Sequence, residues 1–238
     1  MGGIPGAGAT HDRIPATPPS NREADVARLI LGVTGNIASG KSETARLLQQ
    51  KGCALVDADA VAHELYGYDR ALVQQLGAEF GQDVLLSNGT LNRKKLGSLV
   101  FGRPEAMAAL NRIVHPALIN AIRERIRSSQ RVMTRLVLDA ALIVELGFAK
   151  EVDHLVFVSA SVPVRLARLM ERSGLTADEA MRRIDSQMPE ESKLQHADYV
   201  IKNETTKEYL AEQVDALWED IILHEQRDEA GFDAHGPD

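Results

Sequence analysis

The feature that most constrains the fold of this chain is the segment 35–42, which reads GNIASGKS. It matches G-x-x-x-x-G-K-[S/T] at every fixed position, the pattern of a loop whose backbone N–H groups surround phosphate oxygens. The apolar run at 29–33 predicts a buried strand before the loop, and the residues from Ser42 onward predict a helix after it. The four fixed positions match by chance in about one chain in a hundred. A strand before the match and a helix after it make a chance match rarer still, so we interpret the segment as a phosphate-binding loop.

The chemistry of such a loop assigns roles to its residues. Lys41 is expected to reach the β- and γ-phosphates of ATP, and the Ser42 hydroxyl to bind Mg²⁺. Glycines let the backbone curl round the phosphates, and the start of the helix adds the positive end of its dipole. The residues predicted to bind ATP here are Gly35, Ala38, Ser39, Gly40, Lys41, Ser42 and Glu43.

Short apolar runs alternate with longer helical patterns along the rest of the chain. A parallel sheet with helices on both faces has this pattern, because parallel strands are joined by helical crossovers. We therefore expect an α/β fold with a central parallel five-stranded sheet flanked by helices. The expected strands lie at 29–33, 53–56, 136–138, 154–158 and 199–201.

The uneven spacing of these strands predicts how the chain is divided. The long helical stretch between the second and third strands predicts an inserted substrate-binding lobe at about 62–128, and two helical pieces at about 170–190 predict a small lid. Residues 1–26, rich in Gly, Ala, Pro and Thr, predict a disordered extension or a start site placed too far upstream. Residues 226–238 predict a flexible tail, which leaves 27–225 as the folded domain.

Two carboxylates follow the second strand directly, in the sequence Asp57-Ala58-Asp59. Ligands of open α/β sheets bind at the carboxyl ends of strands, so both residues are candidates for the nucleotide site. We favour Asp59 as a general base that accepts the proton of an attacking hydroxyl, and Asp57 as a metal-side ligand. The alternative is that they cap the following helix, since Asp is a preferred N-cap residue.

The third strand also ends in an acidic residue, Asp139, which could support Mg²⁺ through water. Alternatively, Asp139 only ends the strand. Glu145, a few residues later, could line the same crevice or face solvent on a helix.

Arginines line the helix predicted after Ser161-Val162-Pro163. Arg165, Arg168 and Arg172 fall at i, i+3 and i+7 and share one face. On a lid they would bring positive charge to the transferring phosphoryl group, and we expect Arg168 and Arg172 to contact phosphate. The alternative is that they are solvated surface charges.

Beyond single motifs, the order of several segments resembles dephospho-CoA kinase over about residues 28–220. The matching segments are 34–42 (TGNIASGKS), 57–59 (DAD) with His63, 91–96 (LNRKKL), 110–116 (LNRIVHP), 142–145 (LIVE), 184–189 (IDSQMP), and Lys193 with 197–203 (ADYVIKN).

This resemblance implies a P-loop kinase with a nucleotide-kinase-like core, which phosphorylates the ribose 3′-hydroxyl of dephospho-CoA with ATP to give CoA and ADP. It implies that Asp59 is the base, that Arg93, His115 and Glu145 lie near the acceptor, and that Arg168 and Asn203 lie near the nucleotide. His63 is placed with the acceptor residues; the alternatives are that His63 and His115 serve in helix packing.

The loop departs from the family pattern at Asn36, Ala38 and Glu43. Asn tolerates left-handed backbone, whereas Ala38 is strained if its position requires a positive φ. Glu43 places a carboxylate near the phosphates, which the helix dipole favours and the nucleotide does not. These departures bear on affinity and rate more than on the type of reaction.

Composition narrows the remaining functions. The net charge of -7 argues against a broad surface for duplex nucleic acid, and no apolar run is long enough to span a bilayer. One cysteine and the absence of a secretory pattern favour a cytoplasmic protein, a monomer or small homo-oligomer. The alternatives are another small-molecule P-loop kinase, acting on a nucleoside or nucleotide, and a non-catalytic nucleotide switch.

Overall fold

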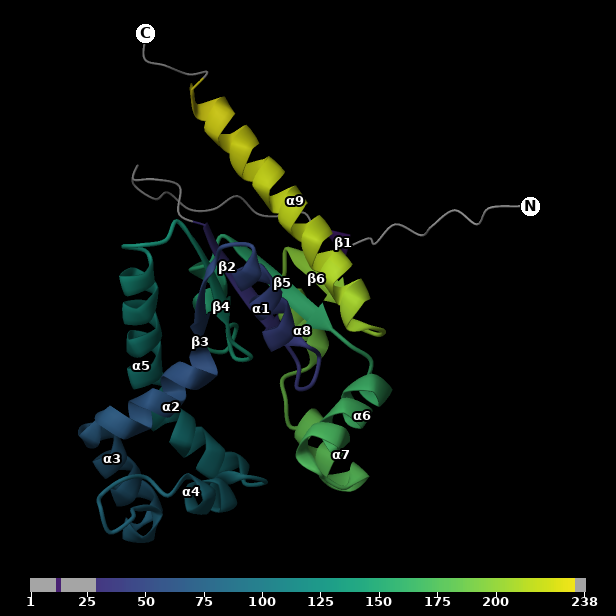
Figure 1. Ribbon diagram of the computed structural model, residues 1–238. Helices are drawn as coiled ribbons and strands as arrows, with labels where there is room; N and C mark the ends of the chain where they lie inside the picture. Colours follow the sequence, from purple (N-terminus) through teal and green to yellow (C-terminus); the bar gives the residue numbers. More distant parts are fainter. Residues whose placement is uncertain (1–11, 14–28, 234–238) are drawn as a thin grey trace. The chain divides into compact units, whose positions relative to one another are not determined.

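The computed structural model describes residues 12–13 and 29–233 (Figure 1). The predicted N-terminal extension therefore lies outside the described residues, apart from the short strand β1, Asp12–Arg13. The chain divides into two compact units, residues 1–55 with 137–238 and residues 56–136. We call the first the sheet unit and the second the helical unit.

The sheet contains the five predicted strands and one more. Its order is β1-β6-β5-β2-β4-β3. β2 pairs in parallel with β5, with Leu31 opposite His154, and β5 pairs in parallel with β6. β1 adds an antiparallel edge next to β6, which the sequence analysis did not foresee. The strands after β1 are β2 Leu29–Gly35, β3 Ala54–Asp57, β4 Arg135–Asp139, β5 His154–Ser159 and β6 Tyr199–Lys202.

Helices α1, Lys41–Gln50, and α9, Lys207–Asp233, lie side by side against the sheet in Figure 1. Their apolar residues Leu48, Val214 and Leu217 pack with strand residues such as Val33 and Val156 in one buried cluster. β2 and β5 are buried over nearly their whole length, as expected for strands covered on both faces. This core fixes the carboxyl ends of three strands. The phosphate-binding loop follows β2, α6 follows β5, and Asn203 follows β6.

Two further helices of the sheet unit lie in the stretch predicted as a lid. α6, Val162–Ser173, ends at Gly174, whose positive φ of 62° is the usual left-handed residue after a helix. α7, Ala177–Asp185, begins with a capping box, in which the side chains of Thr176 and Glu179 each bond the backbone N–H of the other residue. The short helix α8, Glu190–Leu194, follows and leads to β6.

α9 continues past Gln226 to Asp233, so the predicted tail is helical there, and residues 234–238 lie outside the described part. Among the helices of residues 29–233, none has the length and apolar composition needed to cross a bilayer.

The helical unit is built round one long helix. α5, Pro104–Ser129, contacts the other three, which are α2, Ala58–Tyr68, α3, Arg70–Phe80, and α4, Arg93–Val100. α5 passes through Pro116 and buries Val114, Leu118 and Ile122 on one side. These helices occupy the stretch that the sequence predicted as an inserted helical lobe.

Candidate active site

The phosphate-binding loop connects β2 to α1 as predicted, and its two fixed glycines are required sterically. A Cβ at Gly35 would lie 2.5 Å from the backbone oxygen of Val158, on the neighbouring strand. Gly40 has a φ of 100°, and a Cβ there would lie 2.1 Å from Nδ2 of Asn203. Any side chain at either position would push the loop away from β5 or β6.

Ala38 is the departure that matters most for the backbone. Its φ is 62°, and among the described residues no other side-chain-bearing residue has a positive φ. The left-handed region costs an L-residue about 1–2 kcal/mol, a penalty that glycine escapes. The concern raised by the sequence at Ala38 is therefore confirmed, while Asn36 adopts no such conformation.

At the start of α1, Lys41 forms an ion pair with Asp139, the last residue of β4. The Asp139 side chain is almost fully buried, at 3% exposure, and that of Lys41 is 11% exposed. Ser42 follows as an exposed residue of the first turn. Asp139 thus does more than end a strand: it holds the ammonium group of the loop lysine at the carboxyl edge of the sheet.

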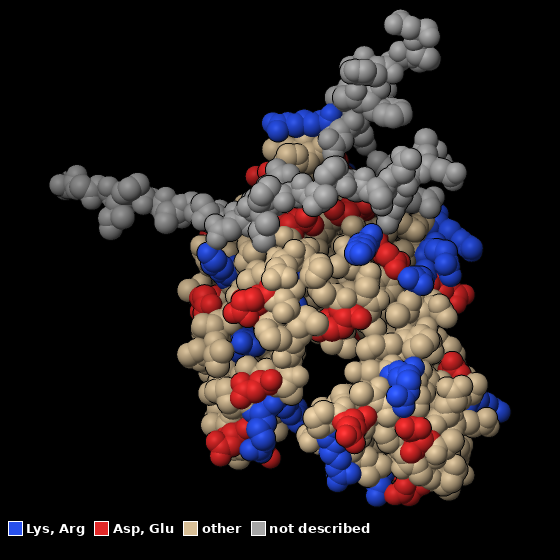
Figure 2. All heavy atoms as spheres, turned by 180° about the vertical axis from the view of Figure 1, so that it is seen from behind, with Lys and Arg blue, Asp and Glu red and all other residues tan. Residues whose placement is uncertain are grey.

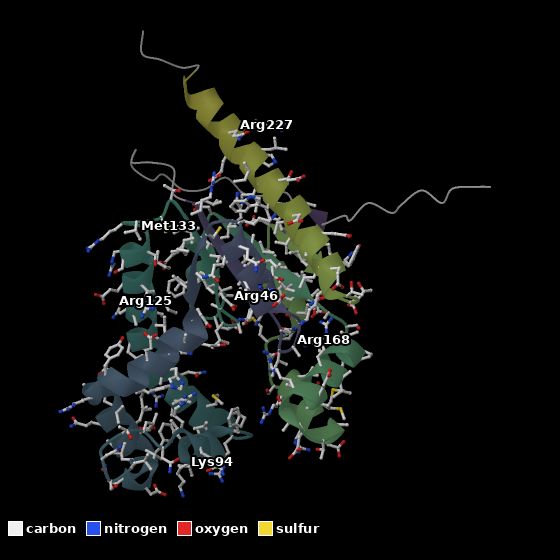
Figure 3. The ribbon with its side chains drawn as sticks, in the orientation of Figure 1. Arg46, Lys94, Arg125, Met133, Arg168 and Arg227 are labelled. Atoms are coloured by element: carbon white, nitrogen blue, oxygen red, sulfur yellow. The ribbon has the colours of Figure 1, made fainter. Side chains whose placement is uncertain are left out.

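Arg168 on α6 and Asn203, which directly follows β6, contact the loop from another side. The guanidinium of Arg168 donates to the Ser39 carbonyl oxygen at 3.5 Å and to Oδ1 of Asn203 at 3.3 Å. Asn203 in turn donates through Nδ2 to the same Ser39 oxygen at 2.8 Å. Figure 3 shows Arg168 where α6 approaches the loop. The sequence placed both residues at the nucleotide, and both contact the loop directly.

Apolar packing holds α6 and α7 against the loop as well. Leu169 of α6 and Ile184 of α7 form a cluster against which Ile37 and Ala38 pack. Gln187 adds a hydrogen bond, its Oε1 accepting from the backbone N–H of Ile37 at 2.7 Å. Arg172 lies exposed in the last turn of α6, away from these contacts.

The sequence did not predict that two charged side chains at this site would be buried. Arg165 is 5% exposed, and its Nε and Nη1 find no partner among the described residues. Lys193 of α8 is 1% exposed and pairs with Glu145, Nζ to Oε1, at 3.3 Å. The burial of Arg165 and Lys193 cannot be read from the neighbouring sequence, because a charged residue on a short or amphipathic helix is normally predicted to face solvent.

Glu43, the acidic departure in the loop, is neutralised locally. Both its oxygens accept from Arg46, Oε2 from Nε at 3.0 Å and Oε1 from Nη2 at 2.5 Å. The hydrogen bonds from Arg46 lower the pKa of Glu43, so its carboxylate is ionised and paired on the surface of α1.

In the helical unit, Asp57 is the N-cap of α2. Its Oδ1 accepts from the backbone N–H groups of Asp59 at 2.8 Å and of Ala60 at 3.1 Å. The capping alternative is thus observed for Asp57, and Oδ1 is engaged in it. Asp59 lies exposed in the first turn of the same helix.

Three residues predicted for the acceptor also lie in this unit. Arg93, at the start of α4, donates to Nδ1 of His63 on α2, so these two predicted residues are brought together. Burial raises the pKa of Tyr66, one turn from His63, while the charge of Arg93 opposes that rise. His115 lies half-buried on α5 next to Pro116.

Lys and Arg side chains are interspersed with Asp and Glu on the face that Figure 2 shows.

Comparison with known proteins gives a consistent result. The family model described as dephospho-CoA kinase matches residues 29–208. The chain is 41% identical to a dephospho-CoA kinase of Shouchella clausii over 189 residues, which are 79% of this chain and 96% of that protein. It is 35% identical to one of Chlorobaculum tepidum over 202 residues, which are 82% of this chain and 95% of the other.

Solved structures agree with this match. The protein TT1252 from Thermus thermophilus aligns with a TM-score of 0.66 and 32% identity, covering 81% of this chain and 97% of that one. A dephospho-CoA kinase from Campylobacter jejuni aligns with a TM-score of 0.61 and 25% identity, covering 81% and 96%. The residues matched by the family model include the phosphate-binding loop, Asp139, Arg168 and Asn203.

Proposed function

The chain belongs to the dephospho-CoA kinase family, and from that premise we propose how its residues carry out the family's reaction. That reaction transfers the γ-phosphoryl group of ATP to the ribose 3′-hydroxyl of dephospho-CoA, giving CoA and ADP in the final step of coenzyme A biosynthesis. The observation that carries this assignment to the site is the phosphate-binding loop, whose Lys41 is paired with Asp139 and whose Ser39 carbonyl is held by Arg168 and Asn203.

In the sheet unit, the chain stabilises charge. The backbone N–H groups of the loop and the ammonium of Lys41 bind the β- and γ-phosphates, and the Arg168 guanidinium adds positive charge from the lid. Asp139 holds the ammonium of Lys41, and Asn203 and the Ser39 carbonyl hold the guanidinium of Arg168. Preorganised donors of this kind lower the barrier because they need not reorient as charge moves onto the oxygens.

Asp59 is the proposed general base that activates the 3′-hydroxyl of the acceptor. It accepts the proton of the 3′-hydroxyl as the oxygen forms its bond to the γ-phosphorus, while the bond from that phosphorus to the bridging oxygen of ADP breaks. We keep Asp59 in this role and Asp57 as a metal-side ligand, whose Oδ1 caps α2.

Magnesium is the proposed metal. The residues that would hold it are Ser42, Asp139 and, through its second carboxylate oxygen, Asp57; these are the hard oxygen ligands that Mg²⁺ prefers. No group of three or more His, Cys, Asp or Glu side chains suited to a metal occurs among the described residues. When bound, Mg²⁺ neutralises charge on the β- and γ-phosphates.

For the acceptor, we propose His63, Arg93 and His115 in the helical unit and Glu145 in the sheet unit. Arg93 carries a fixed positive charge next to His63, which suits an anionic group such as the diphosphate of dephospho-CoA. Arg172 and Glu43 stay in the proposed nucleotide site. A cytoplasmic location and a monomer or small homo-oligomer remain part of the proposal.

A panel of acceptors tests the function. ADP release is measured with ATP and Mg²⁺ and each of dephospho-CoA, adenosine, AMP and pantetheine. We expect turnover with dephospho-CoA alone. Turnover with adenosine or AMP but not dephospho-CoA would point instead to a nucleoside or nucleotide kinase, and guanine selectivity without transfer would point to a nucleotide switch.

A further inference from the structure

Lys193 is the most deeply buried cation whose environment the structure describes outside the phosphate loop. Its side chain is 1% exposed, and Nζ donates to the carbonyl oxygen of Ala141 at 2.8 Å. The same ammonium pairs with Oε1 of Glu145 at 3.3 Å. A buried ammonium is costly unless it is paired and hydrogen-bonded, so these contacts define its position closely.

Glu145 uses only one of its oxygens in this pair. Its Oε2 has no hydrogen-bond partner among the described residues, although the atom is shielded from water. The side chain as a whole is 18% exposed, so the carboxylate lies at the margin of the surface and not in the core. An ionised oxygen left without a donor is unfavourable, and such an oxygen at a functional site indicates a donor that arrives with a ligand.

The pair lies at the carboxyl edge of the sheet, beside the phosphate-binding loop. The Ala141 oxygen that Lys193 binds also accepts from Oγ1 of Thr34, the penultimate residue of β2, at 3.3 Å. Ala141 itself follows Asp139, the partner of Lys41, by one intervening residue. Lys193 and Thr34 therefore hold the same carbonyl group of the segment after β4, next to the strand that leads into the phosphate-binding loop.

We propose that Lys193 is a positioning residue, which holds Glu145 so that Oε2 accepts a hydrogen bond from a ribose hydroxyl of the acceptor. This inference rests on the proposed function and adds to it a residue on α8 that contacts neither substrate. A hydroxyl is the fitting donor because it is neutral and small, and because ionised carboxylates bind it strongly. Both ATP and dephospho-CoA carry ribose hydroxyls, so the experiment must separate them.

A double-mutant cycle tests the coupling. The variants are Glu145→Gln, Lys193→Met and the two together, each assayed for kcat and for the KM of dephospho-CoA and of ATP. We expect each single change to lower kcat/KM for dephospho-CoA by roughly ten- to a hundredfold, as for losing a hydrogen bond to a charged group. KM for ATP stays within about twofold, and the double variant is no worse than the worse single variant, because Lys193 acts through Glu145.

Controls separate this from a purely structural role. Lys193→Met alone leaves the Glu145 charge near the interior without its partner; if that variant does not fold, the double variant, which removes both charges, is compared with Glu145→Gln. Lys193→Arg, which keeps the cation, should recover part of the loss. The affinity for dephospho-CoA, measured by calorimetry without ATP, should fall by about the same factor as kcat/KM.

Three results would overturn the inference. The first is that Lys193→Met lowers kcat/KM for dephospho-CoA by the same factor in the Glu145→Gln variant as in the wild type. The second is a change in KM for ATP alone. The third is that all variants have the kinetics of an active wild type. If the wild type fails to phosphorylate dephospho-CoA, the proposed function is what fails, and the inference falls with it.

Discussion

Lys41 and Asp139 form an ion pair in which a carboxylate only 3% exposed holds the lysine of the phosphate-binding loop. The pair joins the loop after β2 to the end of β4. It gives Lys41 two functions, one in the fold and one in phosphoryl transfer, and these two functions can be separated by mutation.

Lys41→Met should abolish measurable turnover, because the ammonium acts on the charge that develops on the phosphates. It should also lower the free energy of unfolding by about 3 kcal/mol, because Asp139 is left buried without its partner. The double variant Lys41→Met/Asp139→Asn is the control: it should regain most of the stability and none of the activity. Denaturant unfolding with the coupled assay checks both, and turnover above a tenth of the wild-type rate in either variant would remove Lys41 from the chemistry.

Asp59→Asn should lower kcat by ~10²–10⁴ with little effect on stability, if Asp59 is the base. The matched change is Asp57→Ala, which removes the observed cap of α2 and should cost about 1 kcal/mol of stability. Thermal unfolding of the two variants separates their effects on the helix start, and kcat of Asp59→Asn tests the base. An unchanged kcat for Asp59→Asn would make Asp59 a residue of the helix start only.

Ala38→Gly should stabilise the loop, because glycine adopts the observed φ of 62° without the steric penalty. The gain is reduced by the greater freedom of glycine in the unfolded chain, so we expect a net increase of about 0.5 kcal/mol. KM for ATP should fall or stay the same. A loss of stability would mean that packing of the Ala38 methyl against the α6 and α7 cluster outweighs the backbone strain.

Arg46→Met should raise KM for ATP by about two- to fivefold, because it leaves the carboxylate of Glu43 unneutralised in the first turn of α1. The effect should fade as salt is added, since both side chains lie near the surface. Glu43→Gln/Arg46→Met should restore the wild-type KM. A KM that does not respond to Arg46→Met at low salt would show that Glu43 does not influence the nucleotide.

The parts of the fold predicted correctly are those in which chemistry or local periodicity fixes the residue types. The phosphate-binding loop requires its glycines and lysine at set positions, and the strands around it are continuous apolar runs. The capping box at Thr176 is also a local signal, readable over four residues, and the structure contains it.

The parts missed depend on contacts between distant residues. β1 is a two-residue strand that pairs with β6, and no local pattern marks it. The burial of Lys193 depends on Glu145 and on the Ala141 carbonyl, far away along the chain. The sequence could suggest that Asp139 belonged to the site, but not that its partner would be Lys41.

The most direct test of the account is identification of the product. The protein is incubated with ATP, Mg²⁺ and dephospho-CoA, and the products are analysed by mass spectrometry and phosphorus NMR. The account predicts CoA carrying the new phosphate on the ribose 3′-oxygen, formed in equal amount with ADP. ADP without a phosphorylated acceptor, or a phosphate at another position, would contradict it.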